Sequence, residues 1–126
     1  MKIYLATPVN ARKEKTLHQK MNGALKSIQM MAKYLKKNFD PEFEPLCSFD
    51  IPEVWNYFLG RRKDPPSEPF VMGECVRMLM EADMIVLDDG WECSQGCTVE
   101  RFVAMQYGKQ VKTINSFKLA EQLKTK

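Results

Sequence analysis

The chain has 126 residues, of which 44% are hydrophobic and 28% charged, and this length suits a single domain, residues 1–126, with one apolar core. Lysine and arginine number 19 against 16 aspartate and glutamate residues, so the net charge of +3 is too small to predict binding to a nucleic-acid polymer. No stretch approaches the roughly 18 apolar residues that span a bilayer, and the first residues read as a strand rather than a signal peptide, so we expect a cytoplasmic protein without membrane contact.

The N-terminal third predicts a strand, a loop and a long helix. Ile3–Ala6 reads as a short buried strand, and Thr7–Arg12 as the loop that leaves it. From Leu17 onward, apolar residues recur at steps of three and four until Asn38–Pro41, which predicts an amphipathic helix with lysines on its outer face. The apolar positions are Leu17, Met21, Ala24, Leu25, Ile28, Met31, Ala32 and Leu35.

The middle of the chain predicts a second strand, two helices and a third strand. Phe43–Phe49 is compatible with a strand, and Ile51–Leu59 with a short helix. Gly60–Pro69 contains three prolines, which remove backbone donors, so we expect an exposed loop there. The apolar spacing of Met72–Met80 indicates a helix that leads into the strand Met84–Leu87.

The C-terminal third predicts one more helix, a strand and a terminal helix. The apolar spacing of Val99–Tyr107 indicates a helix, and Gly108 stops it. Gln110–Ile114 reads as the last strand, and Ser116 is expected to cap a short helix through Leu123. Strands that alternate with helices favour parallel pairing, so the predicted class is α/β with helices on both faces of the sheet.

The four cysteines are expected to be reduced, because the cytoplasm disfavours structural disulfides. Cys93 and Cys97 form a C-x3-C pair, but a zinc site needs about four ligands. Only His18 and the distant Cys47 and Cys75 remain to complete one. We therefore predict no metal and no cofactor.

A polar segment from Asp88 to Glu100 directly follows the strand Met84–Leu87. Ligands of open α/β sheets bind at the carboxyl ends of strands, which makes this segment the main candidate site. Gly96 permits a tight or left-handed turn and a close approach by a ligand. Ser94 precedes a helix, whose positive N-terminal end binds phosphate or another anion.

Glu100 lies about one turn into that helix and can point back towards the same pocket. A carboxylate beside a sugar can attack the anomeric carbon and form a glycosyl ester, which water or another nucleophile later resolves. Each residue also has a purely structural interpretation. Ser94 can cap the helix, Gly96 can serve only as a turn, and Glu100 can interact with the helix dipole.

Several stretches carry a resemblance to a known family: Lys2-Ile3-Tyr4-Leu5-Ala6-Thr7-Pro8, Glu81–Leu87, the G-W-E-x-S-x-G stretch of Gly90–Gly96 with Thr98-Val99-Glu100, and then Ala104, Gly108, Lys109 and Val111. Together they resemble the nucleoside 2-deoxyribosyltransferase-like superfamily, in a branch of uncharacterised small bacterial and phage proteins. The resemblance implies a flavodoxin-like three-layer fold, with a mainly parallel sheet of about four to five strands. It also implies a homodimer or a higher homo-oligomer.

Members of that superfamily cleave or exchange the N-glycosidic bond of nucleosides or nucleotides. The resemblance implies that Glu100 is the nucleophile. It implies that Ser94 contacts the phosphate, as in the hydrolases of nucleoside 5'-monophosphates, whereas the transferases tend to carry Asp there. The first loop supplies ligand contacts in the family, which makes Thr7 and Arg12 substrate-binding candidates. A capping threonine and a solvated arginine are the alternatives.

One departure from the family pattern concerns the second catalytic carboxylate. Catalytic members carry an Asp at the position of Cys75, eight residues before Asp83. Glu74 is adjacent, and it replaces that carboxylate only if the helix shifts or its side chain bends round, since neighbours on a helix point about 100° apart. Without general acid assistance to the departing base, the rate of cleavage falls by a factor of about 10²–10⁴.

Other loop residues complete the candidate site. Trp91 can stack on a base or a sugar, or it can cover the edge of the core. Asp89 can bind ribose hydroxyls or merely solvate the strand end, and Gly90 belongs to the same substrate-binding loop. Two hypotheses follow: an enzyme acting on the N-glycosidic bond of a nucleoside 5'-monophosphate-like substrate through Glu100, and a non-catalytic nucleotide-binding domain with the same pocket.

Overall fold

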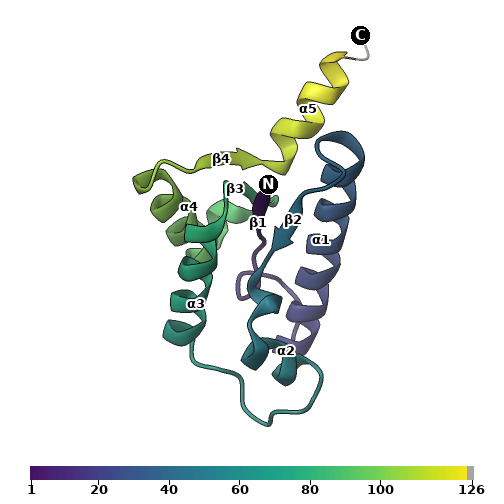
Figure 1. Ribbon diagram of the computed structural model, residues 1–126. Helices are drawn as coiled ribbons and strands as arrows, with labels where there is room; N and C mark the ends of the chain where they lie inside the picture. Colours follow the sequence, from purple (N-terminus) through teal and green to yellow (C-terminus); the bar gives the residue numbers. More distant parts are fainter. Residues whose placement is uncertain (125–126) are drawn as a thin grey trace.

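The computed structural model describes residues 1–124 and shows an α/β fold around a four-stranded, all-parallel sheet with the strand order β2-β1-β3-β4. This result confirms the predicted fold class, and the arrangement is that of a flavodoxin-like three-layer fold. The elements are β1 Lys2–Ala6, α1 Leu17–Asn38, β2 Glu44–Leu46, η1 Ser48–Asp50, α2 Pro52–Phe58, α3 Glu68–Glu81, β3 Met84–Leu87, η2 Trp91–Cys93, α4 Gln95–Gln106, β4 Gln110–Thr113 and α5 Ile114–Lys124 (Figure 1).

The two central strands, β1 and β3, form the middle of the core. They pair in parallel from Ile3 opposite Met84 to Ala6 opposite Leu87. All four residues of β3 are buried, as are Ile3–Ala6 of β1. Such continuous apolar runs are expected of parallel strands that are covered on both faces.

Helices cover both faces of this sheet. Figure 1 shows α1 on one side and α3 with α4 on the other. The terminal helix α5 lies beside the C-terminal half of α1, where the Phe39 and Phe117 rings are 5.1 Å apart and the Tyr34 hydroxyl donates a hydrogen bond to Glu121. The catalytic candidate Glu100 is on α4, on the face of the sheet opposite α1.

The long helix α1 begins with a capping box and ends with basic residues. Thr16 accepts a hydrogen bond from the Gln19 amide, and the Gln19 side chain accepts one from the Thr16 amide, which forms a capping box. Lys36 and Lys37 lie in its last turn, near the negative end of the helix dipole.

The second strand is shorter than predicted. Only Glu44–Leu46 of the stretch Phe43–Phe49 pairs with β1, and Ser48–Asp50 forms a 3-10 turn instead. The cause is local, because the Asp50 carboxylate accepts the Cys47 amide hydrogen bond at 2.9 Å. That bond turns the chain away from the sheet.

The proline-rich loop ends two residues earlier than predicted, because Glu68 and Pro69 already belong to α3. The Ser67 hydroxyl accepts the Phe70 amide at 3.3 Å and caps this helix. A proline is tolerated in the first helical turn, where its missing donor has no partner to lose.

The cap predicted for the terminal helix was assigned to the wrong residue. Ser116 lies inside α5, and its backbone amide donates a hydrogen bond to the Thr113 hydroxyl at 3.2 Å. Thr113 therefore caps the helix from the last residue of β4, and Ile114 belongs to α5 rather than to the strand.

Within residues 1–124, none of the helices combines the length and the apolar character that crossing a membrane requires. All four cysteines are free, with Cys93 exposed and the other three buried. Among the same residues, no group of three or more histidine, cysteine or acidic side chains is arranged to hold a metal ion.

Candidate functional site

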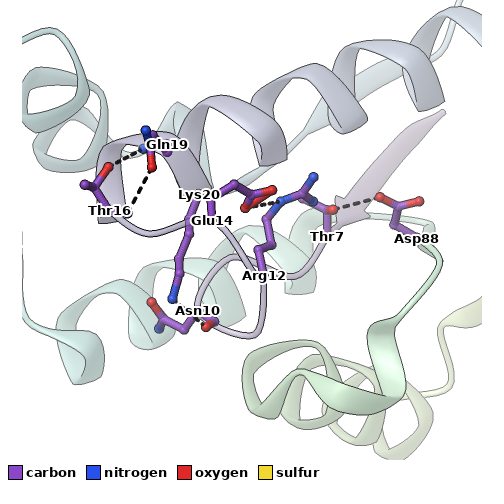
Figure 2. Close-up of polar contacts among 8 residues, drawn as sticks. All are labelled: Thr7, Asn10, Arg12, Glu14, Thr16, Gln19, Lys20 and Asp88. Atoms are coloured by element: carbon purple, nitrogen blue, oxygen red, sulfur yellow. Dashed lines mark hydrogen bonds and ion pairs between the residues drawn. The ribbon is translucent and has the colours of Figure 1, made fainter.

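The carboxyl ends of β1 and β3 define the candidate site. The chain runs from β1 through α1 to β2 on one side and from β3 through α4 to β4 on the other, so a topological switch point lies between these two strands. Thr7 follows β1 and donates a hydrogen bond of 2.8 Å to the Asp88 carboxylate, which follows β3 (Figure 2). The predicted Thr7 hydroxyl therefore does lie at this edge, and in the structure its partner is Asp88.

The loop after β3 turns at Gly90. This residue has a φ of 81°, in the left-handed region that favours glycine. The left-handed turn considered for Gly96 was wrong, because Gly96 lies in the first turn of α4 without a positive φ. A Cβ on Gly96 would approach the Met72 Cε at 3.7 Å, which is an ordinary contact.

Ser94 is the N-cap of α4 and is 8% exposed. Its hydroxyl accepts the Cys97 amide at 3.2 Å, and its carbonyl accepts the Thr98 hydroxyl at 2.8 Å. Ser94 therefore caps the helix, as its structural interpretation predicted. A hydroxyl that accepts one hydrogen bond keeps its own proton, so capping leaves Ser94 able to donate to an anion.

Glu100 lies on the buried side of α4, together with Cys97 and Ala104 at helical spacing. Only 6% of this residue is exposed, and the Oε2 atom is buried without a hydrogen-bond partner. Burial raises the pKa of Glu100 from its usual 4.5 to about 7, and a hydrogen bond with the Tyr4 side chain offsets part of that increase. At neutral pH the ionised and protonated forms are therefore both populated.

Tyr4 is a member of the site that the sequence did not indicate. It lies in the middle of β1, opposite Ile85, and is 2% exposed. Burial, with the adjacent Glu100 carboxylate and the Cys75 thiol, raises the pKa of Tyr4 well above its usual range, so its hydroxyl is protonated. The available signal was a hydroxyl-bearing aromatic inside an otherwise aliphatic strand.

Cys75 of α3 completes a buried cluster with Tyr4 and Glu100. Burial is the main cause that raises the pKa of the Cys75 thiol to about 12, and the Glu100 charge adds to it. We call these three residues, Tyr4, Cys75 and Glu100, the carboxyl cluster. Cys75 gives this cluster a thiol at the position where the resemblance implies a carboxylate.

Glu74, the other predicted catalytic residue, interacts along its own helix. Its Oε2 atom lies 2.8 Å from Arg77 Nη2 and accepts a hydrogen bond from Arg77 Nε at 2.9 Å. The neighbouring Cys75, rather than Glu74, faces Tyr4 and Glu100. The catalytic role of Glu74 stays a prediction, and this arrangement does not support it.

The two other loop candidates, Trp91 and Asp89, both have partners. The Arg101 guanidinium lies 5.1 Å from the centre of the half-buried Trp91 ring, which also packs against the core. Asp89 is exposed and accepts a hydrogen bond from the Asn115 side-chain amide. Trp91 thus does cover the core edge, which was one of its two interpretations.

Arg12 lies across the first half of α1. Its Nε atom is 3.4 Å from a Glu14 carboxylate oxygen and is buried without a hydrogen bond (Figure 2). A Cβ at Gly23 would come within 2.9 Å of Arg12 Nη2, so the glycine makes room for the guanidinium. Arg12 is therefore held by its own loop and helix rather than extended into solvent.

The part of the chain that contains α3, β3, α4 and β4 is similar to a described domain. A family model for a domain of unknown function (DUF4406) matches residues 61–113. The matched stretch includes Cys75, Ser94 and Glu100. Comparisons with curated proteins and with solved structures gave no match.

Proposed function

We propose that the protein cleaves, or transfers from, the N-glycosidic bond of a nucleoside 5'-monophosphate-like substrate, with Glu100 as the nucleophile. The observation that carries this proposal is the buried Glu100 carboxyl group, whose Oε2 atom has no hydrogen-bond partner. Buried polar groups are nearly always paired, and an unpaired one needs an explanation such as catalysis. The resemblance to the nucleoside 2-deoxyribosyltransferase-like superfamily supplies the reaction class.

The chemistry of the proposed step follows from this carboxylate. Its free oxygen attacks the anomeric carbon, the bond to the base breaks, and a glycosyl ester forms on Glu100. Water or a second acceptor then attacks the same carbon and releases the carboxylate. The Tyr4 hydrogen bond favours the ionised form of Glu100, which is the form that attacks.

The first turn of α4 is the proposed phosphate subsite. The backbone amides of Gln95 and Gly96, together with the Ser94 hydroxyl, stand at the positive end of this helix. Thr7 and Arg12 on the first loop, and Asp89, Gly90 and Trp91 on the loop after β3, are proposed to bind the rest of the substrate.

A non-catalytic nucleotide-binding domain is the second candidate function. The observation in its favour is Cys75, whose thiol occupies the place beside Glu100 and has a pKa of about 12. Such a thiol is a weak acid at neutral pH and gives little help to a departing base. In this case the same residues would bind a nucleotide without cleaving it.

The outer surface of α4 supports the expected homodimer. Val99, Phe102, Met105 and Tyr107 are 38%, 60%, 52% and 68% exposed, respectively. An apolar surface of this kind is typical of a protein interface, and we propose that a second copy of the chain covers it. Light scattering should give a dimer mass for the wild type and a monomer mass for Phe102→Glu; a wild-type monomer would contradict the proposal.

The direct test is release of base from a panel of ribonucleoside and deoxyribonucleoside 5'-monophosphates. We expect Glu100→Gln to abolish release, because the amide is a far weaker nucleophile than a carboxylate. Glu81→Gln is the matched control, since this glutamate lies exposed at the end of α3. Release that persists unchanged in Glu100→Gln would refute the mechanism, and binding without release would favour the second candidate.

A further inference from the structure

Three titratable side chains interact with Glu100, and none of them can carry a positive charge. Tyr4 comes from β1, Cys75 from α3 and Cys97 from α4 itself. Among residues 1–124, no lysine, arginine or histidine forms an ion pair with Glu100. The Glu100 carboxylate therefore lacks the positive partner that a buried negative charge ordinarily requires.

The carboxyl cluster also lacks a second carboxylic acid. Glu100 is the only buried acidic residue among residues 1–124. The two hydrogen-bonding groups beside it, the Cys75 thiol and the Tyr4 hydroxyl, hold their protons tightly at neutral pH. A neutral base that leaves with an electron pair needs a proton, and the cluster is poorly equipped to supply one.

We propose that the substrate base itself carries the positive charge, as in a pyridinium nucleotide or an N7-alkylated purine nucleotide. This inference rests on the proposed function and names its substrate class. A cationic base compensates the missing positive partner of Glu100 when it binds. It also leaves as a neutral molecule, so the missing acid is not required. One property of the ligand thus accounts for both observations.

The reaction balances without a further reactant except water. A Glu100 carboxylate oxygen forms a bond to the anomeric carbon while the carbon–nitrogen bond breaks. The electron pair of that bond stays on the ring nitrogen and cancels the positive charge of the base. Water then attacks the anomeric carbon, the ester bond breaks, the carboxylate is regenerated, and one proton is released to solvent.

The test compares substrates that differ by one methyl group and one charge. Guanosine 5'-monophosphate is neutral at the base, and its N7-methyl derivative is cationic; both are tested as ribo- and deoxyribonucleotides, with β-nicotinamide mononucleotide as the pyridinium probe. We expect kcat/KM for the cationic substrates to exceed that for the neutral one by about 10²-fold or more, the range that acid assistance ordinarily supplies. Rates with Glu100→Gln are subtracted as background.

Cationic bases are intrinsically better leaving groups, so a faster rate alone does not show that the site lacks an acid. A variant that restores an acid distinguishes these two explanations. Cys75→Asp should raise the ratio of kcat/KM for the neutral substrate to kcat/KM for the methylated substrate by at least tenfold. Cys75→Ser keeps a neutral group at this position and should preserve the wild-type preference. Circular dichroism identifies which variants fold, and the wild-type comparison stands if Cys75→Asp does not.

The outcomes distinguish this proposal from the one on which it rests. Equal release from the neutral and cationic substrates, dependent on Glu100, would overturn the cationic-base inference and leave the proposed function intact. The absence of Glu100-dependent release from every substrate would overturn both. A folded Cys75→Asp variant in which the ratio of kcat/KM for the neutral substrate to that for the methylated substrate does not rise would contradict the role assigned to the missing acid.

Discussion

The carboxyl cluster and the loop between β1 and α1 satisfy their polar groups in opposite ways. Polar groups of the loop have partners in the loop or in the neighbouring helix; the Asn10 carbonyl, for example, accepts a hydrogen bond of 3.1 Å from Lys20 of α1 (Figure 2). In the cluster, Glu100 is 6% exposed and one of its oxygens has no partner. The loop contacts are explained by the conformation that they stabilise, whereas no intramolecular contact satisfies the Glu100 oxygen, and we propose a ligand as its partner.

Arg12 lies in the loop but shares one property with the carboxyl cluster, a buried polar atom without a hydrogen bond. It belongs to the loop and pairs with Glu14, yet its Nε atom is as buried and unbonded as the Glu100 oxygen. An anionic substrate group is the natural partner for such a guanidinium. We therefore propose a binding role for Arg12 rather than for Asn10 or Lys20, whose polar groups form hydrogen bonds.

The largest expected difference between the carboxyl cluster and the loop is in the pH dependence of the unfolding free energy. The pKa of Glu100 in the folded state, about 7, lies above its usual 4.5, so the folded protein binds more protons between these values. This contribution is fully present below pH 4.5 and is lost as the pH rises through 7, a change of about 3 kcal/mol. Urea unfolding should show Glu100→Gln gaining that amount relative to the wild type between pH 4.5 and pH 8; a constant difference would contradict the burial.

Tyr4→Phe tests whether the cluster works as a unit. Its hydroxyl lowers the pKa of Glu100, so its removal should raise that pKa and leave less carboxylate at neutral pH. We expect roughly tenfold slower base release at pH 7, and a shift of the acid limb of the pH–rate profile to higher pH. Tyr107→Phe, at a residue that is 68% exposed, is the control. An unmoved profile would remove Tyr4 from the site.

Ser94→Ala and Ser67→Ala form a matched pair that separates capping from phosphate binding. Both serines cap a helix, α4 and α3 respectively, so each substitution should cost about 1 kcal/mol of unfolding free energy. Only Ser94→Ala should weaken binding of nucleoside monophosphates in calorimetry. Equal affinities for the two variants would leave Ser94 with its capping role alone.

Thr7→Val is expected to have the smallest effect. It removes the hydrogen bond between Thr7 and Asp88 at the ends of β1 and β3, and the substitution is nearly isosteric. A partly buried bond of this kind contributes about 0.5–1 kcal/mol. Unfolding measurements on Thr7→Val, Asp88→Ala and the double variant give the coupling energy; additive effects would show that this bond does not stabilise the sheet edge.

The order and type of the elements were predictable because they depend on local patterns. Apolar runs predicted β1 and β3, and the three- and four-residue spacing predicted α1. The errors were also local in origin. A side-chain bond from Asp50 shortened β2, and Thr113 rather than Ser116 capped α5. Such alternatives differ by single hydrogen bonds, which residue patterns do not rank.

The site was predictable only in part, because its members come from distant segments. Glu100 and Ser94 share one helix, and their spacing brought them to notice. Tyr4 reaches Glu100 because the register of β1 against β3 places it beneath α4 and α3, across 96 residues of sequence. No local pattern contains that information. The same is true of Cys75, which faces Tyr4 and Glu100 from α3.

The most direct test of the central claim, that Glu100 is a nucleophile, is detection of the glycosyl ester itself. The protein is mixed with a monophosphate substrate, quenched in acid within one turnover, and digested for mass spectrometry. We expect a sugar-phosphate adduct on the peptide that contains Glu100, and no adduct in Glu100→Gln. Release of base with an adduct on another residue, or with none trapped at any quench time, would contradict it.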